Sequence, residues 1–243
     1  LDNGSYTLSE SDFPCWRLLH TGAQPIPPIV IRRVQEYFPH LECQVSYGLT
    51  ESGGPGCLNL SGDRMDKLGS IGRPGLGWEA KVVDAQGRTL PPDTSGELWI
   101  RSDHMMSRYY KDPASTEKAL AGGWLHTGDV ARMDPEGFFY IDGRMKDVII
   151  SGGENVYPVP IEDFLRKHPA VKDAAVFGIC YCRMGEIVVA KVCLTEPDAC
   201  TAEDLLEFCQ ALPKFERPRK IFLGDIPRNP TGKIDKQALR KQY

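Results

Sequence analysis

The chain has 243 residues, of which 41% are hydrophobic and 26% charged, and its net charge is −4. This composition is sufficient for a packed core and excludes an intrinsically disordered chain, while the length allows one large domain or two smaller ones. The negative charge argues against nucleic acid as a partner. No apolar run approaches the ~20 residues of a membrane-spanning helix, and the start lacks a secretory signal pattern. We therefore expect a soluble, cytoplasmic protein without a transmembrane segment.

The first third of the chain alternates predicted strands with a helix. Residues 16–22 and 41–48 have the apolar character of short buried strands. Between them, Pro28 in a first turn favours a helix that runs to about Phe38. A glycine-rich loop is expected over 47–56. This order predicts an open α/β sheet, in which ligands bind at the carboxyl ends of the strands.

A β-rich unit is expected over about residues 63–145. Alternating apolar and polar residues predict antiparallel strands over 78–90 and 96–102, and residues 134–137 have the pattern of a hairpin turn. Asp112, followed by a proline, has the pattern of a helix N-cap. The short strands and frequent turns indicate a small, barrel-like fold.

The remainder of the chain predicts a compact α+β domain of ordinary size. Its expected helices are 159–168, 201–212 and 235–243, and its expected strands are 171–179, 185–195 and 218–227. A Thr-x-x-Asp capping signal opens the second helix. We therefore divide the chain into a first domain over 1–145 and a second over 146–243, and we expect the second to fold on its own.

Charge and cysteine placement narrow the kinds of site that are possible. Residues 212–243 carry a charge of +6, which leaves −10 for the rest of the chain. Such a basic tail suits either the handling of an anion or a solvated face packed on acidic neighbours. The eight cysteines include no Cys-x-x-Cys pair, and the five histidines include no ligand-spaced pair. We therefore expect reduced, buried thiols and no zinc site.

Four loops carry residues suited to a phosphorylated nucleotide, although each alone is also compatible with an ordinary surface turn. In the first, Tyr47 can stack on a base, Thr50 can bind a phosphate oxygen and Glu51 can hold Mg²⁺. In the second, Asp129 follows a glycine at a strand end, a position suited to ribose hydroxyls. In the third, Arg144 offers a permanently charged donor fork to ribose or phosphate.

The third loop continues to a diglycine, and the fourth carries a lysine. Gly152 and Gly153 permit a close approach of the backbone to a ligand. Lys233 stands at the tip of a Pro-Thr-Gly-Lys turn, which limits the conformational entropy that the lysine loses on docking. A solvated surface lysine is the alternative interpretation of this turn.

Six motifs occur in one order along the chain: GAQP (22–25), YGLTE (47–51), GELWIRS…YYKDP (96–113), WLHTGD (124–129), GRMKDVIISGGENVYPVPIE (144–162) and PTGKID (230–235). Together they resemble the adenylate-forming (AMP-binding) superfamily of acyl- and aryl-CoA synthetases, firefly luciferase and peptide-synthetase adenylation domains. The resemblance begins at about Trp16 and reaches the last residue. It implies an α/β plus α+β fold: the distal part of the large domain, with its β-barrel-like unit, followed by a mobile α+β lid.

The resemblance also implies an activity and its residues. In this family a carboxylate attacks the α-phosphate of Mg-ATP, and the thiol of CoA then displaces AMP from the acyl-adenylate. The implied nucleotide-binding residues are Gly22, Ala23, Gln24, Tyr47, Gly48, Thr50, Asp129 and Arg144. Glu51 would bind Mg²⁺, and Lys233 would stabilise the charge that develops on the α-phosphate. Lys146 would be the hinge of the lid. The implied CoA-channel residues are Gly152, Gly153 and Glu154.

Two parts of the family pattern have no match in residues 1–243: the glycine-, serine- and threonine-rich phosphate loop, and the N-terminal portion with most of the carboxylate pocket. We therefore expect the carboxyl-terminal half of a synthetase, inactive alone, whose partners are the missing N-terminal half, ATP, CoA and a small carboxylic acid. Residues 52–59 are expected near the acyl group, and medium-chain fatty, alicyclic and aryl acids all stay open. The alternatives are an adenylation domain that loads a carrier protein, and a non-catalytic nucleotide-binding or interaction fragment.

Overall fold

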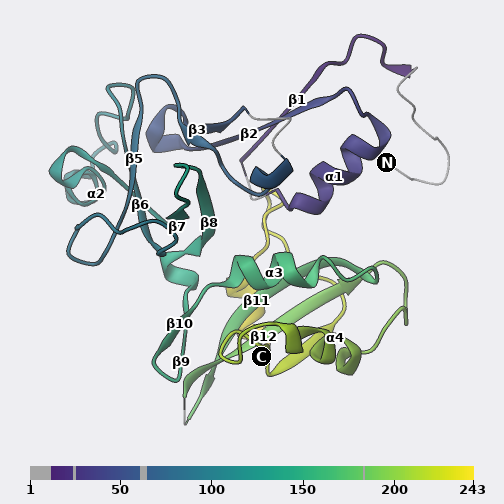
Figure 1. Cartoon of the computed structure of the whole chain (residues 1–243). Helices are drawn as coiled ribbons and strands as arrows, with labels where there is room; N and C mark the ends of the chain where they lie inside the picture. Colours follow the sequence, from purple (N-terminus) through teal and green to yellow (C-terminus); the bar gives the residue numbers. More distant parts are fainter. Residues whose placement is uncertain (1–11, 24–25, 61–64, 183) are drawn as a thin grey trace. The chain divides into compact units, whose positions relative to one another are not determined.

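Two compact units make up the computed structural model, which describes residues 12–23, 26–60, 65–182 and 184–243 (Figure 1). Unit 1 extends to Thr127 and also includes Ala131–Ile141, whereas unit 2 consists of Gly128–Val130 and Asp142–Tyr243. The division therefore falls within two consecutive strands, a few residues before the boundary expected after residue 145.

Short helices and strands alternate along the described residues. The helices are α1 (Pro28–Tyr37), α2 (Pro113–Ala119), α3 (Pro158–Leu165), α4 (Ala202–Phe208) and α5 (Lys236–Gln242). The strands are β1 (Leu18–Thr21), β2 (Glu42–Leu49), β3 (Gly54–Asn59), β4 (Arg73–Pro74), β5 (Glu79–Val83), β6 (Gly96–Arg101), β7 (Leu125–Met133), β8 (Phe139–Arg144), β9 (Ile149–Ser151), β10 (Glu154–Val156), β11 (Val171–Tyr181), β12 (Gly185–Leu194) and β13 (Lys220–Leu223). Short 3₁₀ turns lie at Thr50–Ser52, Met65–Lys67, Ala121–Gly123, Met145–Asp147 and Cys209–Ala211.

The first sheet of unit 1 has the strand order β1-β2-β3-β4. β1 and β2 run parallel and α1 connects them, which is the predicted α/β arrangement. Ile31 of α1 lies in one buried cluster with Cys43 and Val45, because alternate residues of β2 face the same side. The loop predicted over 47–56 is wrong at both ends, because residues 47–49 belong to β2 and residues 54–56 begin β3. Gly53, with a φ of +69°, reverses the chain, and β3 then pairs antiparallel with β2.

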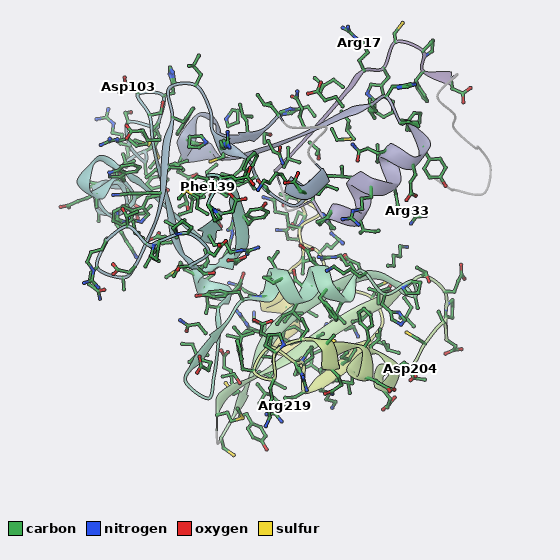
Figure 2. The ribbon with its side chains drawn as sticks, in the orientation of Figure 1. Arg17, Arg33, Asp103, Phe139, Asp204 and Arg219 are labelled. Atoms are coloured by element: carbon green, nitrogen blue, oxygen red, sulfur yellow. The ribbon has the colours of Figure 1, made fainter. Side chains whose placement is uncertain are left out.

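The second sheet, most of which belongs to unit 1, has the order β5-β6-β7-β8, and its first two strands are antiparallel as predicted. This sheet lies where the barrel-like unit is expected, and β5 and β8 stand at the two ends of its strand order. Its core includes the fully buried Leu98, Ile100 and Phe139, the last of which is labelled in Figure 2. Asp112 caps α2 by accepting a hydrogen bond from the Ser115 N–H at 3.0 Å, which confirms the predicted N-cap.

Unit 2 is built on a sheet with the order β10-β9-β12-β11, to which β13 adds in parallel beside β12. β11 and β12 form a long antiparallel pair whose alternate residues face opposite sides. Val176 lies in a core cluster with Ile161 of α3 and Leu205 of α4. Its neighbour Phe177 packs instead with Leu239 of α5. Helices α3 and α4, both labelled in Figure 1, therefore cover one face of the sheet and α5 covers the other.

The cysteines are free thiols, as expected, but the expected burial is only partly right. The buried ones are Cys43, Cys57 and Cys209, and the exposed ones are Cys15, Cys180 and Cys182. The last two lie where β11 turns toward β12, so the turn exposes a pair that the apolar sequence around it suggested would be buried. In the part of the chain that the structure describes, none of the helices is long and apolar enough to cross a membrane.

Candidate functional site

The loop at Gly22 follows β1 and lies against β2. A Cβ atom at Gly22 would lie 2.6 Å from both the carbonyl oxygen and Oγ of Ser46, so the position requires glycine. Ala23 has a φ of +65°, a left-handed conformation that is uncommon for a residue with a side chain. Because β1 and β2 are parallel, this turn stands at the carboxyl end of a strand, where open α/β sheets bind ligands. Gln24, the third residue predicted for this strip, lies outside the described residues.

Tyr47 and Gly48 lie at an irregularity in the pairing of β2 with β3. A Cβ at Gly48 would lie 2.5 Å from the carbonyl oxygen of Gly54, so the two backbones approach closely there. The Tyr47 side chain is half-buried against the cluster that contains Leu98 and Ile100. Bulges of this kind re-aim side chains next to binding sites. The role of Tyr47 as the adenine-stacking ring stays a prediction.

The turn Thr50–Ser52 holds Glu51 in a defined position. The Ser52 hydroxyl is buried and accepts a hydrogen bond from the Leu49 N–H at 2.9 Å, which closes the turn. The Glu51 carboxylate accepts a hydrogen bond from the Tyr109 hydroxyl at 2.8 Å, between Oη and Oε1. Burial, and then the Glu51 carboxylate, raise the pKa of Tyr109, so this phenol stays a donor. Thr50 is exposed beside it.

The role of Glu51 as a Mg²⁺ ligand stays a prediction. Over the described ranges, the structure brings together no group of three or more His, Cys, Asp and Glu side chains that could hold a metal ion. Mg²⁺ commonly takes one or two carboxylates and completes its shell with waters and substrate phosphates. Tyr109 orients this carboxylate, and sequence reasoning missed it because the two residues lie 58 positions apart.

Asp129 and Arg144 form an ion pair, with 3.2 Å between Oδ1 and Nε. The Asp129 side chain is only 7% exposed, whereas the Arg144 side chain is 50% exposed. Gly128 precedes the aspartate with a φ of +69°, but both residues lie inside β7, so the strand end predicted at Asp129 is wrong. The pair therefore places an acceptor and a donor fork together, a combination that suits a vicinal diol. The structure thus unites the two residues that the sequence assigned to the ribose.

The predicted hinge and CoA-channel residues lie on exposed turns of unit 2. Lys146 is exposed in a 3₁₀ turn directly after β8. Gly152 and Gly153, with φ values of +62° and +90°, form the two-residue turn between β9 and β10, and only glycine adopts both conformations readily. The Gly152 N–H donates to the carbonyl oxygen of Met184 at 2.9 Å, which ties this turn to the start of β12. Glu154 is exposed at the start of β10.

Lys233 lies on a loop that the Asn229 side chain closes. Asn229 Oδ1 accepts hydrogen bonds from the N–H groups of Thr231 at 3.1 Å and Lys233 at 3.0 Å. The Asn229 N–H donates to the Lys233 carbonyl at 2.8 Å, and Gly232 has a φ of +80°. The Lys233 side chain is exposed, and among the described residues it makes no ion pair. An asparagine before Pro-x-Gly is a turn signal, so Asn229 was open to prediction from the sequence.

The predicted residues thus form two groups, one in each unit. In unit 1, Gly22 and the segment Tyr47–Glu51 meet around β2. In unit 2, Asp129 and Arg144 are in contact, while Lys146, the Gly152 turn and the Lys233 loop lie on separate exposed turns.

Two family models match the chain. The model described as AMP-binding enzyme matches residues 2–110, and the model described as AMP-binding enzyme C-terminal domain matches residues 160–233. Between them they cover most of the sequence, on both sides of the division between the units.

Named relatives are similar to this chain over almost all of its length. The long-chain-fatty-acid–CoA ligase FadD13 of Mycobacterium tuberculosis is 38% identical over 238 residues, which are 97% of this chain and 46% of the relative. The mitochondrial medium-chain acyl-CoA ligase ACSF2 of Bos taurus is 40% identical over 223 residues, 90% of this chain and 36% of the relative. The chain therefore spans less than half the length of these curated relatives.

A solved structure supports the same relationship. The o-succinylbenzoate coenzyme A synthetase MenE of Bacillus subtilis, in complex with ATP and a magnesium ion, superposes with a TM-score of 0.80 at 34% identity. The match covers 93% of this chain and 46% of that one. At this identity and coverage, the fold of the chain is that of a part of an adenylate-forming enzyme.

Proposed function

Because this chain belongs to the AMP-binding enzyme family, as its motifs predicted, we propose that it forms the carboxyl-terminal half of an AMP-forming acid–thiol ligase. Its substrates would be a carboxylic acid, ATP and CoA. The observation that carries this proposal is Lys233, an exposed cation on a loop closed by hydrogen bonds, whose ammonium group meets no carboxylate among the described residues. A lysine held in this way is ready for an anionic partner, whereas Lys67 and Lys236 are already neutralised by carboxylates.

The first step would be adenylation. A carboxylate oxygen of the acid attacks the α-phosphorus of ATP and pyrophosphate leaves. Negative charge builds on the α-phosphate in the transition state, so a positioned ammonium stabilises this state more than the ground state. Lys233 would supply that charge, Asp129 and Arg144 would bind the ribose, and Tyr47 would stack on the adenine. The Gly22 strip and Gly48 would border the nucleotide, and Thr50 would bind phosphate.

Glu51 would hold Mg²⁺ through a carboxylate that Tyr109 orients from its Oε1 side. When bound, this ion would neutralise phosphate charge and keep the nucleotide in one orientation. The chain would therefore contribute one carboxylate ligand, together with the phenol that donates a hydrogen bond to it.

The second step would transfer the acyl group. The CoA thiol loses its proton to solvent and attacks the acyl carbon as the thiolate, and AMP leaves with the electron pair of the broken acyl–oxygen bond. In the family, the terminal domain rotates between the steps, which withdraws the lysine and presents the diglycine turn to the thiol. Lys146 would be the hinge of this rotation, since one residue in a short connection can absorb the backbone change. The exposed turn of Gly152, Gly153 and Glu154 would then line the pantetheine path.

The relatives support an aliphatic or aryl acid without selecting one. The names of FadD13, ACSF2 and MenE refer to long-chain, medium-chain and succinylbenzoate acids respectively. Residues 52–59, expected near the acyl group, include the buried Ser52, Cys57 and Asn59. Because these side chains are buried inside unit 1, they do not indicate which acid binds. A panel of carboxylic acids, tested with the full-length protein by measuring CoA consumption, would identify it.

Replacement of Lys233 tests the proposal directly. In the full-length protein, Lys233→Ala should lower acyl-adenylate formation by about 10²–10³-fold, the effect of removing one preorganised donor. Lys241→Ala, which removes an exposed lysine from α5, should change the rate little. The measurement is ATP–pyrophosphate exchange with the acid selected by the panel. Equal rates for wild type and Lys233→Ala would contradict the proposal.

Two alternatives are separated by further assays. A comparison of free CoA with a phosphopantetheinylated carrier as the acceptor distinguishes a CoA ligase from a carrier-loading domain. The 243-residue chain by itself should show no useful exchange, because its sequence contains no match to the phosphate loop; robust exchange would contradict that expectation. In the full-length protein, binding of AMP without turnover, lost in Asp129→Ala, would favour a non-catalytic nucleotide-binding role.

A further inference from the structure

Arg228 joins the Lys233 loop to the body of unit 2. Its Nη1 donates a hydrogen bond to the carbonyl oxygen of Gly232 at 2.7 Å, so it holds the residue directly before the lysine. Its Nη2 donates to Oδ2 of Asp173 on β11. An isolated antiparallel β-bridge between the backbones of Arg228 and Ile234 closes the base of the loop. One guanidinium therefore contacts both the loop tip and the sheet.

Asp173 is itself held by a second arginine. Its Oδ1 accepts from Nε and Nη2 of Arg166, both at 3.1 Å, and from the Ala174 N–H at 2.9 Å. Arg166 lies at the end of α3, is 12% exposed, and also donates to Asp163 at 3.0 Å. The chain of contacts thus runs from α3 through β11 to the loop. Its inner members are mostly buried, so their geometry is fixed by the core that surrounds them.

The other side of the loop is tied to the same helix. Lys236, in the first turn of α5, pairs with Oε1 of Glu162 at 2.7 Å, and both side chains are largely buried. The same Glu162 oxygen accepts from the Val176 N–H at 2.9 Å. The residues before and after Lys233 are therefore both anchored on α3 and β11, while the Lys233 ammonium stays exposed to solvent.

From this geometry we propose that Arg228, oriented by Asp173, is a positioning residue that fixes the Lys233 loop for adenylation. The inference rests on the proposed function, because it assigns Lys233 to that step. Arginine suits this positioning role because its planar guanidinium donates hydrogen bonds to two partners in fixed, different directions. The rotatable donors of a lysine ammonium fix the geometry less tightly. Asp173 pairs with Arg228 and offsets part of its charge, whereas Lys233 makes no ion pair among the described residues.

The kinetic test uses the full-length protein and separates the two half-reactions. Arg228→Ala should lower acyl-adenylate formation by about 10–100-fold, since a displacement of about 1 Å can cost 10²-fold in rate. Thioester formation from supplied acyl-adenylate should stay within about 2-fold of wild type, because that step does not use Lys233. Arg228→Lys should restore part of the loss. Lys172→Ala, which removes an exposed charge beside Asp173, should leave both steps unchanged.

An equal loss in both half-reactions would indicate a purely structural role and overturn the proposal, as would an unchanged adenylation rate. A second measurement needs no activity and uses the 243-residue chain. Amide hydrogen exchange at Thr231–Lys233 should rise at least about 10-fold in Arg228→Ala, while exchange in β11 and β12 stays as in wild type. Unchanged exchange in the loop would overturn the positioning role of Arg228. If exchange rises in Arg228→Ala but Lys233→Ala forms the acyl-adenylate at the wild-type rate, the proposed function fails instead.

Discussion

At the scale of single residues, Gly72 shows how closely the backbone of unit 1 is packed. A Cβ at this position would lie 1.9 Å from the carbonyl oxygen of Leu58, and the residue has a φ of +86°. Gly77 has a similar φ of +77° but open space around it. We predict that Gly72→Ala lowers the free energy of unfolding by about 3 kcal/mol or more, whereas Gly77→Ala costs about 1–2 kcal/mol from conformation alone.

Tryptophan fluorescence during urea unfolding measures this difference, because all four tryptophans belong to unit 1. Equal costs for the two variants would mean that the backbone around Leu58 yields easily, contrary to the close packing at Gly72.

Buried thiols give a second prediction at this scale. Burial raises the pKa of Cys57 from 9.0 to about 12. Above pH 9 the folded state therefore keeps the thiol proton while the unfolded state loses it. The contribution of this thiol to the free energy of unfolding is fully present below pH 9 and is lost as the pH rises toward 12. The loss is about 1.4 kcal/mol for each pH unit in this interval.

The matched variant for this effect is Cys57→Ala. It should be less stable at about pH 8, because a core side chain is shortened, but its stability should fall less steeply between about pH 9 and 11. Urea unfolding followed by tryptophan fluorescence at several pH values measures both. Parallel slopes for wild type and variant would exclude a role of the thiol.

At the scale of elements, α4 depends on its capping box. Thr201 Oγ1 accepts from the Asp204 N–H at 3.1 Å, and Asp204 Oδ2 accepts from the Thr201 N–H at 2.8 Å; Figure 2 labels Asp204 on this helix. Thr201→Ala should destabilise the helix by about 1 kcal/mol, which is roughly a 5- to 6-fold rise in amide exchange within α4. Glu207→Ala, an exposed change in the same helix, should have little effect. Exchange that rises equally in both variants would contradict the cap.

The β7–β8 hairpin shows what element-level patterns do not reveal. Its turn at residues 134–137 was predictable from the sequence. The contacts that hold this turn were not predictable: the Lys67 ammonium donates hydrogen bonds to Asp134 at 2.8 Å and to Glu136 at 2.6 Å. Lys67 has only 6% of its surface exposed. A lysine in a polar segment is usually solvated, and only the folding of unit 1 brings this one to two carboxylates almost seventy residues away.

At the scale of the whole molecule, unit 2 should be an independent folding unit. Its two core clusters draw their buried residues from Ile149 to Leu239, so residues 142–243 contain both complete clusters. We predict that this segment, expressed alone, unfolds in one cooperative transition and gives dispersed amide resonances. The comparison is the same unit within the 243-residue chain, by amide exchange. A molten, poorly dispersed spectrum would contradict the prediction.

The sequence by itself determined the family, most of the longer helices and strands, and several turns and caps, because these depend on residues close together in the chain. It did not predict the strands β3, β4, β9 and β10. Asp112, Thr201 and the predicted helices follow from local hydrogen bonds and periodicity. The sequence assigned the start of β3 to a loop and misjudged the exposure of Cys180 and Cys182, since strand pairing and burial depend on distant neighbours.

Only the tertiary structure decided which distant side chains support the candidate site. It placed Tyr109 on Glu51, joined Asp129 to Arg144, and connected Arg228 to Asp173. Each of these contacts joins residues from different strands, turns or helices, and no local pattern encodes such a pairing. Their physical reason is the same in each case: packing of the sheets and helices fixes where the backbones lie, and charge and hydrogen bonding then select the partners.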